Sequence, residues 1–152
     1  MQCQPIRFQN EAEVETFIEV VVNVHDMTVS ATGFRAGKDG DAEQSVSPSV
    51  YAAFVSARVS AFRDVFEQVS FFAEHLSKDH PFGDGNKRTT VKMLIACIRA
   101  CGIQLDIPDP PDPQNNELYQ WIQKLVTGEV SYSQLADFLR SRASASPLED
   151  LL

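Results

Sequence analysis

The apolar positions of the chain recur at intervals of three and four residues over most of its length. This spacing places them on one face of successive α-helices. The first such stripe follows Asn10, which can cap a helix with Glu13 as its capping-box partner. We expect this helix to end near His25 and Asp26. Its apolar positions are Val14, Phe17, Ile18, Val21 and Val24.

The stretch from 28 to 46 breaks this pattern, because it is polar and punctuated by three glycines. Such a composition indicates a mobile loop or a short hairpin that forms a flap. Ser47 and Pro48 then resemble an N-cap followed by a proline at the first helical position. A helix through Tyr51 and Arg58 is expected from this point.

Two strongly apolar stripes follow, one on each side of a polar loop at 80–88. The first predicts a helix that stops before Pro81, since the residue before a proline avoids the helical conformation. The second predicts a helix from about Asn86 to a C-cap at Gly102. Its apolar positions are Val91, Leu94, Ile95 and Ile98.

The last third of the chain predicts an extended segment, a linker and two more helices. Residues 103–107 alternate apolar and polar side chains, and the proline-rich stretch 108–113 cannot be helical. One helix then closes at Gly128, and another begins with a capping box of Ser131 and Gln134. We expect a single all-α domain over residues 1–152, a bundle of about six helices. Its core spans about 10–142, and residues 143–152 form a flexible tail.

Charge and hydropathy narrow the function. The net charge is −8 and the isoelectric point about 4.8, which disfavours binding to nucleic acid phosphates. No apolar run is long enough to span a membrane, and no basic stretch precedes an apolar one near Met1, so neither a membrane segment nor a secretory signal is expected. Three cysteines without framework spacing suggest free thiols in a reducing, cytoplasmic setting, with Cys97 and Cys101 in the core.

The loop at 80–88 concentrates groups suited to phosphate chemistry. Gly83 and Gly85 let the backbone approach a ligand, and the helix that begins at about Asn86 turns free N–H groups and its positive dipole end toward the loop. Lys87 and Arg88 add a point charge and a planar guanidinium that match phosphate oxygens.

Two further residues of the loop suggest catalysis. Asp84 is a carboxylate that could hold Mg²⁺ bridging the phosphate oxygens. His80 has a side chain suited to a general base for an attacking hydroxyl. Phe82 is expected to anchor the loop in the core. The chain contains neither a P-loop with GK[ST] nor the HRD and DFG motifs of protein kinases.

The segment HPFGDGNKRT resembles the signature of the Fic/Doc family, HxFx(D/E)GN followed by GR in most Fic proteins and by KR in the Doc branch. Gly85 is more typical of Fic proteins, whereas Lys87-Arg88 is typical of Doc. His25-Asp26 and the stretch from Thr127 to Ser131 extend the resemblance over most of residues 10–142.

The resemblance implies roles for the loop residues. His80 would deprotonate a target hydroxyl, Asp84 would bind Mg²⁺, and Arg88 would complete the catalytic group. Gly83, Gly85, Asn86, Lys87 and Arg88 would bind the ATP phosphates. The segment 28–46 would be a flap that aligns a target peptide by strand addition.

The residue at position 87 bears on the reaction. Lysine there favours transfer of the γ-phosphate of ATP to a Ser or Thr hydroxyl, as in a Doc-like toxin, over transfer of AMP as in Fic proteins. The target implied by the resemblance is a translation elongation factor such as elongation factor Tu. No [ST]xxxE[GN] inhibitory motif occurs in the chain, so a separate antitoxin chain is expected as the inhibitor.

Two other classes remain open. His25-Asp26 spells the dyad of metal-dependent HD phosphohydrolases, with His75, Asp79 and His80 as further ligands, although the histidine those enzymes need ahead of the dyad is absent. The other class is a Fic-like fold that has no activity and only binds a partner. The intact loop residues argue against this binding module.

Overall fold

The computed structural model describes residues 3–31, 42–82 and 85–145. These residues form six α-helices and one two-stranded antiparallel sheet, which confirms the predicted all-α class. The helices are α1 (Glu11–Ala31), α2 (Ala42–Phe54), α3 (Val65–Asp79), α4 (Asn86–Ala100), α5 (Glu117–Thr127) and α6 (Tyr132–Ser141). The strands are β1 (Ile103–Leu105) and β2 (Ala143–Ala145).

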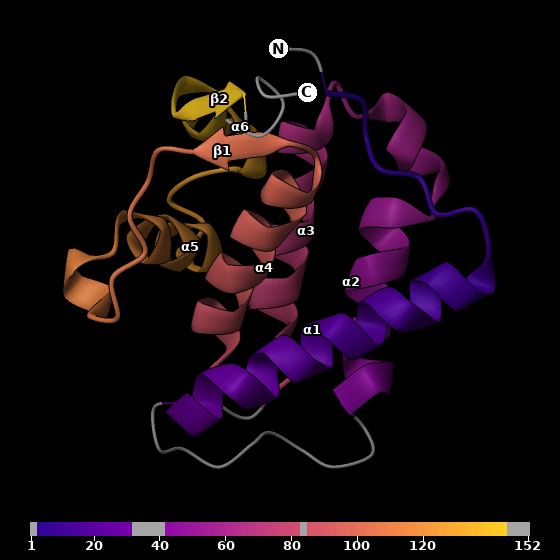
Figure 1. Cartoon of the computed structure of the whole chain (residues 1–152), viewed down its shortest axis with the longest axis horizontal. Coiled ribbons are helices and arrows are strands. Elements are labelled where there is room, and N and C mark those ends of the chain that lie inside the picture. The colour runs from indigo at the N-terminus through magenta and orange to yellow at the C-terminus, as the bar shows by residue number, and fades with distance from the viewer. Residues whose placement is uncertain (1–2, 32–41, 83–84, 146–152) are drawn as a thin grey trace.

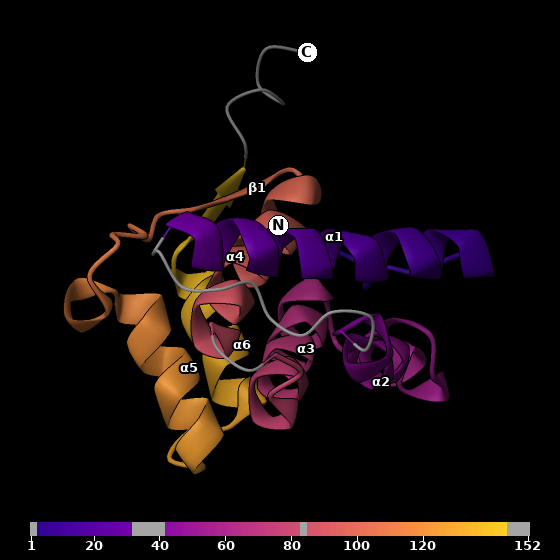
Figure 2. The same cartoon turned by 90° about the horizontal axis from the view of Figure 1, so that it is seen from below.

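Helix α3 lies at the centre of the bundle and packs against α2, α4, α5 and α6. Figure 1 shows α3 and α4 side by side, with α2 on one flank and α5 and α6 on the other. Helix α1 crosses this group along one face, as Figure 2 shows from a second direction. The strongest apolar stripes therefore lie where the most helix surface is buried. Phe66, Phe71 and Phe72 of α3 are core residues, as their spacing predicts.

Helix α1 is longer than expected. Asn10 caps it, since its Oδ1 accepts from the N–H of Glu13 at 3.0 Å, but the helix passes His25 and ends at Ala31. The predicted end near His25-Asp26 is wrong because the buried face continues beyond it: His25, Thr28 and Val29 are 0%, 9% and 1% exposed.

The start of α2 also differs from the prediction. The helix begins at Ala42, so Pro48 lies inside it and Ser47 is no N-cap. Ala42, Val46 and Val50 are buried at intervals of four, and this packing outweighs the N–H group that proline lacks. The helix ends at Phe54, before Arg58, which falls in a 3₁₀ turn at Ala57–Ala61. The predicted flap falls mostly on 32–41, outside the described residues.

The remaining elements follow the sequence closely. Helices α5 and α6 carry the predicted closing Gly128 and the full capping box of Ser131 with Gln134. The segment after Arg142 was expected to be a flexible tail, but Ala143–Ala145 pairs with β1 in the register Ile103↔Ala145 and Leu105↔Ala143. The exposed backbone edge of β1 provides hydrogen-bond partners for Ala143–Ala145, and these partners are not evident from the sequence of the tail alone.

No disulfide joins any of the three cysteines in the described residues. Cys97 is 5% exposed, and burial raises the pKa of its thiol to about 12, so it packs as a small apolar residue. In the described residues no helix is both long and apolar enough to cross a bilayer.

Candidate functional site

The candidate site begins where α3 ends. His80 stops this helix by adopting a left-handed conformation with φ 48° and ψ 56°. No other described non-glycine residue has a positive φ. Such a conformation costs about 1–2 kcal/mol in an L-residue, and strained backbone of this kind concentrates at functional sites. The His80 side chain is exposed and can therefore meet a substrate.

Phe82 anchors the loop in the core, as predicted. It is 3% exposed and stacks on the imidazole of His25, with ring centroids 3.7 Å apart and planes 7° from parallel. The side chain of Asn86 then closes the loop on Phe82. Its Oδ1 accepts from the Phe82 N–H at 3.0 Å, and its Nδ2 donates to the Phe82 carbonyl at 2.8 Å. Asn86 thus holds the loop backbone, whereas its predicted contact with phosphate remains a prediction.

Gly85 permits a close approach between this loop and α1. Its φ is +77°, and an added Cβ would lie 2.8 Å from Val29 Cγ1 and 3.5 Å from the His25 ring. The sequence explained this glycine by the approach of a ligand. The structure adds that α1 packs against it on the protein side.

The first turn of α4 offers backbone N–H groups and two cations. Gly85 is the N-cap and contributes no side-chain hydrogen bond. In the part of the chain that the structure describes, the N–H groups at the first helical positions, Asn86, Lys87 and Arg88, therefore receive no side-chain cap from the N-cap residue. Among the described residues, no carboxylate forms an ion pair with Lys87 or Arg88. This arrangement is suited to binding an anion.

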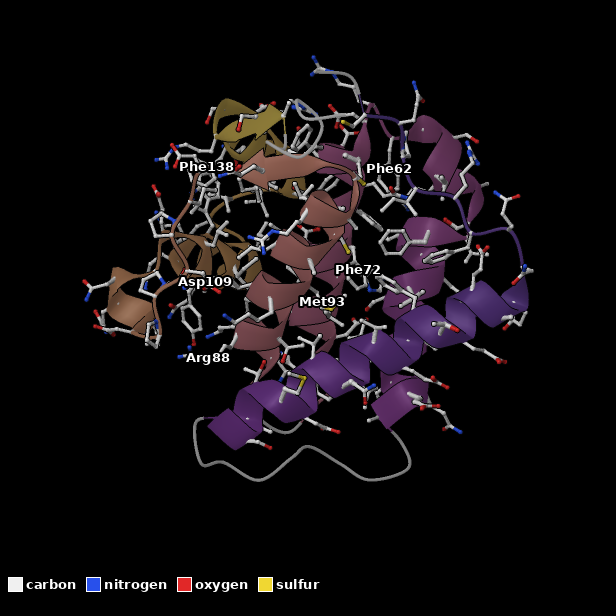
Figure 3. The ribbon with its side chains drawn as sticks, in the orientation of Figure 1. Phe62, Phe72, Arg88, Met93, Asp109 and Phe138 are labelled. Carbon is white, nitrogen blue, oxygen red and sulfur yellow. The ribbon has the colours of Figure 1, made fainter. Side chains whose placement is uncertain are left out.

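A cavity of about 600 Å³ opens beside Arg88. Figure 3 shows Arg88 and Asp109 on the same side of α4. Asp109 forms an ion pair with Lys92 and accepts from Asn116 Nδ2 at 2.6 Å, which fastens the proline-rich segment beside the cavity. His80 is not among the lining residues. They are Val24, Met27, Thr28, Arg88, Lys92, Asp109 and Pro111.

Two predicted site residues, Gly83 and Asp84, lie outside the described residues. The structure places His80 at the end of α3, Gly85 at the N-cap of α4, and Asn86, Lys87 and Arg88 in the first turn of that helix. Of these residues, Arg88 lines the neighbouring cavity and His80 does not. The structure leaves the predicted magnesium ligand untested.

Comparison with known proteins agrees with this geometry. Residues 16–97 match the model of the Fic/DOC family. The protein kinase Doc of Escherichia phage P1 is 30% identical over 124 residues, which cover 80% of this chain and 90% of the phage protein. The chain belongs to the Fic/DOC family. Its similarity to the phage protein supports the Doc branch.

Three residues beside the Fic/DOC loop were missed by reasoning from sequence. His25 was expected to lie at the end of its helix, but it lies within α1 and is fully buried against Phe82. Lys92 and Asp109 line the cavity beside Arg88. Lys92 could have been found from its spacing, because it lies four residues after Arg88 on the same helix and therefore on the same face. Asp109 gave no signal within its proline-rich segment.

The HD phosphohydrolase alternative gains no support from the histidines. No group of three or more potential metal ligands occurs in the described part of this Fic/DOC chain. His75 instead joins Ser49 and Asp79, with its Nδ1 3.2 Å from Ser49 Oγ and 2.8 Å from Asp79 Oδ2. Both partners lie at the same ring nitrogen, whereas a catalytic triad uses the two nitrogens separately. This cluster ties α2 to the end of α3.

Proposed function

We propose that this chain transfers the γ-phosphate of ATP to a Ser or Thr hydroxyl of another protein. The observation that carries the proposal is the segment His80–Arg88, which has the family signature with the Lys87-Arg88 pair typical of Doc and leads into a helix whose N-cap, Gly85, has no side chain. The related phage protein is named a protein kinase, which points in the same direction.

The nucleotide phosphates would lie at the start of α4. The N–H groups of the first turn and the positive end of the helix dipole favour an anion there. Lys87 and Arg88 supply charge, and the guanidinium can donate two parallel hydrogen bonds to phosphate oxygens. Gly83 and Gly85 would add backbone donors, while the Asn86 clamp keeps the loop in shape.

His80 would act as the general base. Its imidazole takes the proton of the target hydroxyl as that oxygen attacks the γ-phosphorus. The bond between the γ-phosphorus and the bridging β–γ oxygen breaks, and ADP leaves with the electron pair. Because His80 is exposed and stands at the end of α3 opposite the start of α4, it can approach a hydroxyl presented from solvent.

Mg²⁺ is the metal expected with ATP, and Asp84 is the carboxylate that would hold it. The cation would neutralise charge on the phosphate oxygens as the bond to the leaving group breaks. The uncapped donors and cations at the start of α4 fit the polyphosphate partner of such an ion.

The same proposal extends to the biological setting. The target would be a translation elongation factor, such as elongation factor Tu, so that its modification inhibits translation in the cytoplasm. Since the chain lacks an inhibitory motif of its own, a separate antitoxin chain would restrain it.

The test is incubation of the purified chain, Mg²⁺ and a cell lysate with ATP labelled at either the α or the γ phosphate. Label should pass to a protein from the γ position alone, and the modified peptide should gain the mass of a phosphoryl group. Transfer of the α label would instead identify an adenylyltransferase, the Fic-type alternative. An absence of transfer from both positions would favour the inactive binding module.

A pair of histidine variants tests the role of the loop. His80→Ala should lower the rate of transfer by about 10²–10⁴-fold, the range of a general base. His75→Ala is the matched control, since this histidine lies five positions earlier in α3 and outside the loop; its rate should stay within about threefold of the wild type. Equal losses in both variants would contradict the assignment of His80.

A further inference from the structure

His25 occupies a position under the signature loop that neither the motif nor the proposed reaction explains. It comes from α1, more than fifty residues before the loop, and its side chain is 0% exposed. Its imidazole covers one face of the Phe82 ring, at 3.7 Å between centroids and 7° between planes. Parallel stacking at this separation fixes the distance between the two ring planes and their relative orientation.

The same imidazole also borders the other side of the loop. An added Cβ on Gly85 would lie 3.5 Å from both Cδ2 and Nε2 of His25, which is ordinary van der Waals contact. Phe82 and Gly85 flank residues 83 and 84 in the sequence. One ring therefore stacks on Phe82 and lies close to Gly85, the described residues on either side of this pair.

The remaining edge of the ring is held by its own helix. Nδ1 of His25 lies 3.3 Å from Oδ1 of the next residue, Asp26, whose side chain is 48% exposed. This polar contact orients the imidazole about its Cβ–Cγ bond, so that the Cδ2–Nε2 edge faces Gly85. Phenylalanine could reproduce the stacking but not this contact, and glutamine could keep a polar group but not the stacking.

A second support acts from within the loop. The side-chain amide of Asn86 closes the backbone of Phe82 through two hydrogen bonds. It fixes the distance between Phe82 and the start of α4. It does not fix the position of that unit relative to α1, which is the contribution of His25.

We infer that His25 is a positioning residue for the phosphate-transfer loop, setting Phe82 and Gly85 so that the first N–H groups of α4 meet the nucleotide correctly. The inference rests on the proposed function. His25 itself touches no substrate and acts through the loop. A displacement of about 1 Å in a reacting group can lower a rate by 10²-fold, so loss of this support should appear in kcat.

The test compares His25→Ala with Val21→Ala. Val21 is the matched control because it is also fully buried, lies one turn earlier on the same face of α1, and contributes none of the three atoms nearest to a Cβ on Gly85. Both variants are assayed for phosphate transfer from ATP at a temperature where circular dichroism shows them folded. His25→Ala should lower kcat by about 10–100-fold with the KM for the target protein within about twofold, whereas Val21→Ala should keep kcat within about threefold.

Two further variants keep the test decisive if His25→Ala folds poorly. His25→Phe retains a stacked ring and should recover part of kcat, while His25→Gln retains only a polar group and should recover less. Equal kcat in His25→Ala and Val21→Ala, or full activity in His25→Gln, would overturn the inference.

A measurement without catalysis separates this inference from the proposed function. Amide hydrogen exchange is followed in the free protein at Phe82 and Thr89, whose N–H groups donate to Asn86 Oδ1 and to the Gly85 carbonyl. Exchange should accelerate at least about tenfold in His25→Ala relative to Val21→Ala. If the wild-type chain transfers no phosphate but this difference appears, the proposed reaction fails while the support of the loop by His25 stands. If exchange is equal in the two variants, the support itself is refuted.

Discussion

Gly85 shows at the scale of one residue how conformation and packing are satisfied together. Its backbone requires a positive φ, and the missing side chain leaves room for Val29 and His25 of α1. Gly128 has almost the same φ, +82°, but nothing lies within 4 Å of an added Cβ there. A side chain at Gly128 would therefore cost only the strain of the left-handed backbone, whereas a side chain at Gly85 would add a steric clash.

Substituting each glycine by alanine should reveal this difference. Gly128→Ala should lower the free energy of unfolding by about 1–2 kcal/mol, the cost of the left-handed conformation. Gly85→Ala should lose a further 1–3 kcal/mol or so, because the new methyl group overlaps Val29 Cγ1. Urea unfolding measures both values. The double variant Gly85→Ala/Val29→Ala should lose less stability than the sum of the losses in the two single variants, because the shorter side chain at 29 removes the overlap. A loss equal to that sum would contradict the crowding.

Arg88 is the cation of the loop that lines the neighbouring cavity. Arg88→Ala should lower the rate of phosphate transfer by about 10²-fold or more, since a donor to developing phosphate charge is lost. Arg88→Lys should recover part of that rate, because charge returns without the planar pair of donors. Initial rates with labelled ATP provide the measurement. Arg99→Ala at the exposed end of α4 is the control, and its rate should match the wild type.

At the scale of elements, α2 shows how tertiary packing overrides a local signal. Pro48 is typical of a helix start, yet α2 begins six residues earlier. The proline removes one hydrogen bond to the carbonyl of Gln44 and is retained because Val46 and Val50 are buried on both sides of it.

Pro48→Ala should therefore stabilise the protein. The restored N–H group can donate to the Gln44 carbonyl, so the free energy of unfolding should rise by about 1–3 kcal/mol. Thermal or urea unfolding would show the change. Ser47→Ala, one position earlier, should shift stability by no more than about 0.5 kcal/mol. A loss of stability in Pro48→Ala would mean that the proline ring makes contacts that outweigh the missing bond.

The success of the sequence reasoning differed from element to element for physical reasons. Helices α3, α4, α5 and α6 were predicted well because their apolar stripes coincide with local caps such as Ser131 and Gly128. The end of α1 was misplaced because buried polar residues such as His25 and Thr28 carry no hydrophobic signal. The start of α2 was misplaced because Pro48 is typical of a first helical turn. Strand β2 was missed since its pairing partner lies forty residues away.

The candidate site was predicted to the extent that it is local in sequence. The loop 80–88, the anchor Phe82 and the start of α4 follow from motif and spacing. The support from His25 and the cavity wall at Asp109 depend on contacts between distant segments, which composition and periodicity do not encode.

At the scale of the whole molecule, one ion pair joins segments seventy-six positions apart. Asp64 caps α3 through the N–H of Glu67 and accepts from Nε and Nη2 of Arg140 in α6, at 2.7 and 3.0 Å. Burial opposes ionisation of Asp64, but the hydrogen bonds from Arg140 and Glu67 outweigh it and hold the pKa of this carboxyl below its usual value of 3.8.

The sign of the pH dependence follows from that lowered pKa. The contribution of the ionised carboxylate is complete above the unfolded-state pKa of about 4, and it is lost as the pH falls through the lower folded-state pKa. Asp64→Asn keeps a capping oxygen but loses the charge, so it should cost about 1–3 kcal/mol at neutral pH. The difference from wild type should shrink below about pH 4.

Urea unfolding at neutral and acidic pH measures this dependence. Asp137→Asn is the control, because this carboxylate pairs with the same Arg140 but is 71% exposed. It should change stability by less than about 1 kcal/mol at either pH. A deficit in Asp64→Asn that persists unchanged in acid would show that the ion pair contributes little.

The small sheet has a practical consequence for handling the protein. Strands β1 and β2 lie at the far end of α4 from the signature loop (Figure 1), and fifteen helical residues separate the two ends by about 22 Å. Ser144 is exposed in β2. A Ser144→Cys variant coupled to a bead or a fluorescent dye, after replacement of Cys3 and Cys101, would leave the loop at 80–88 open to solvent, so that capture of target proteins can be followed on the immobilised protein.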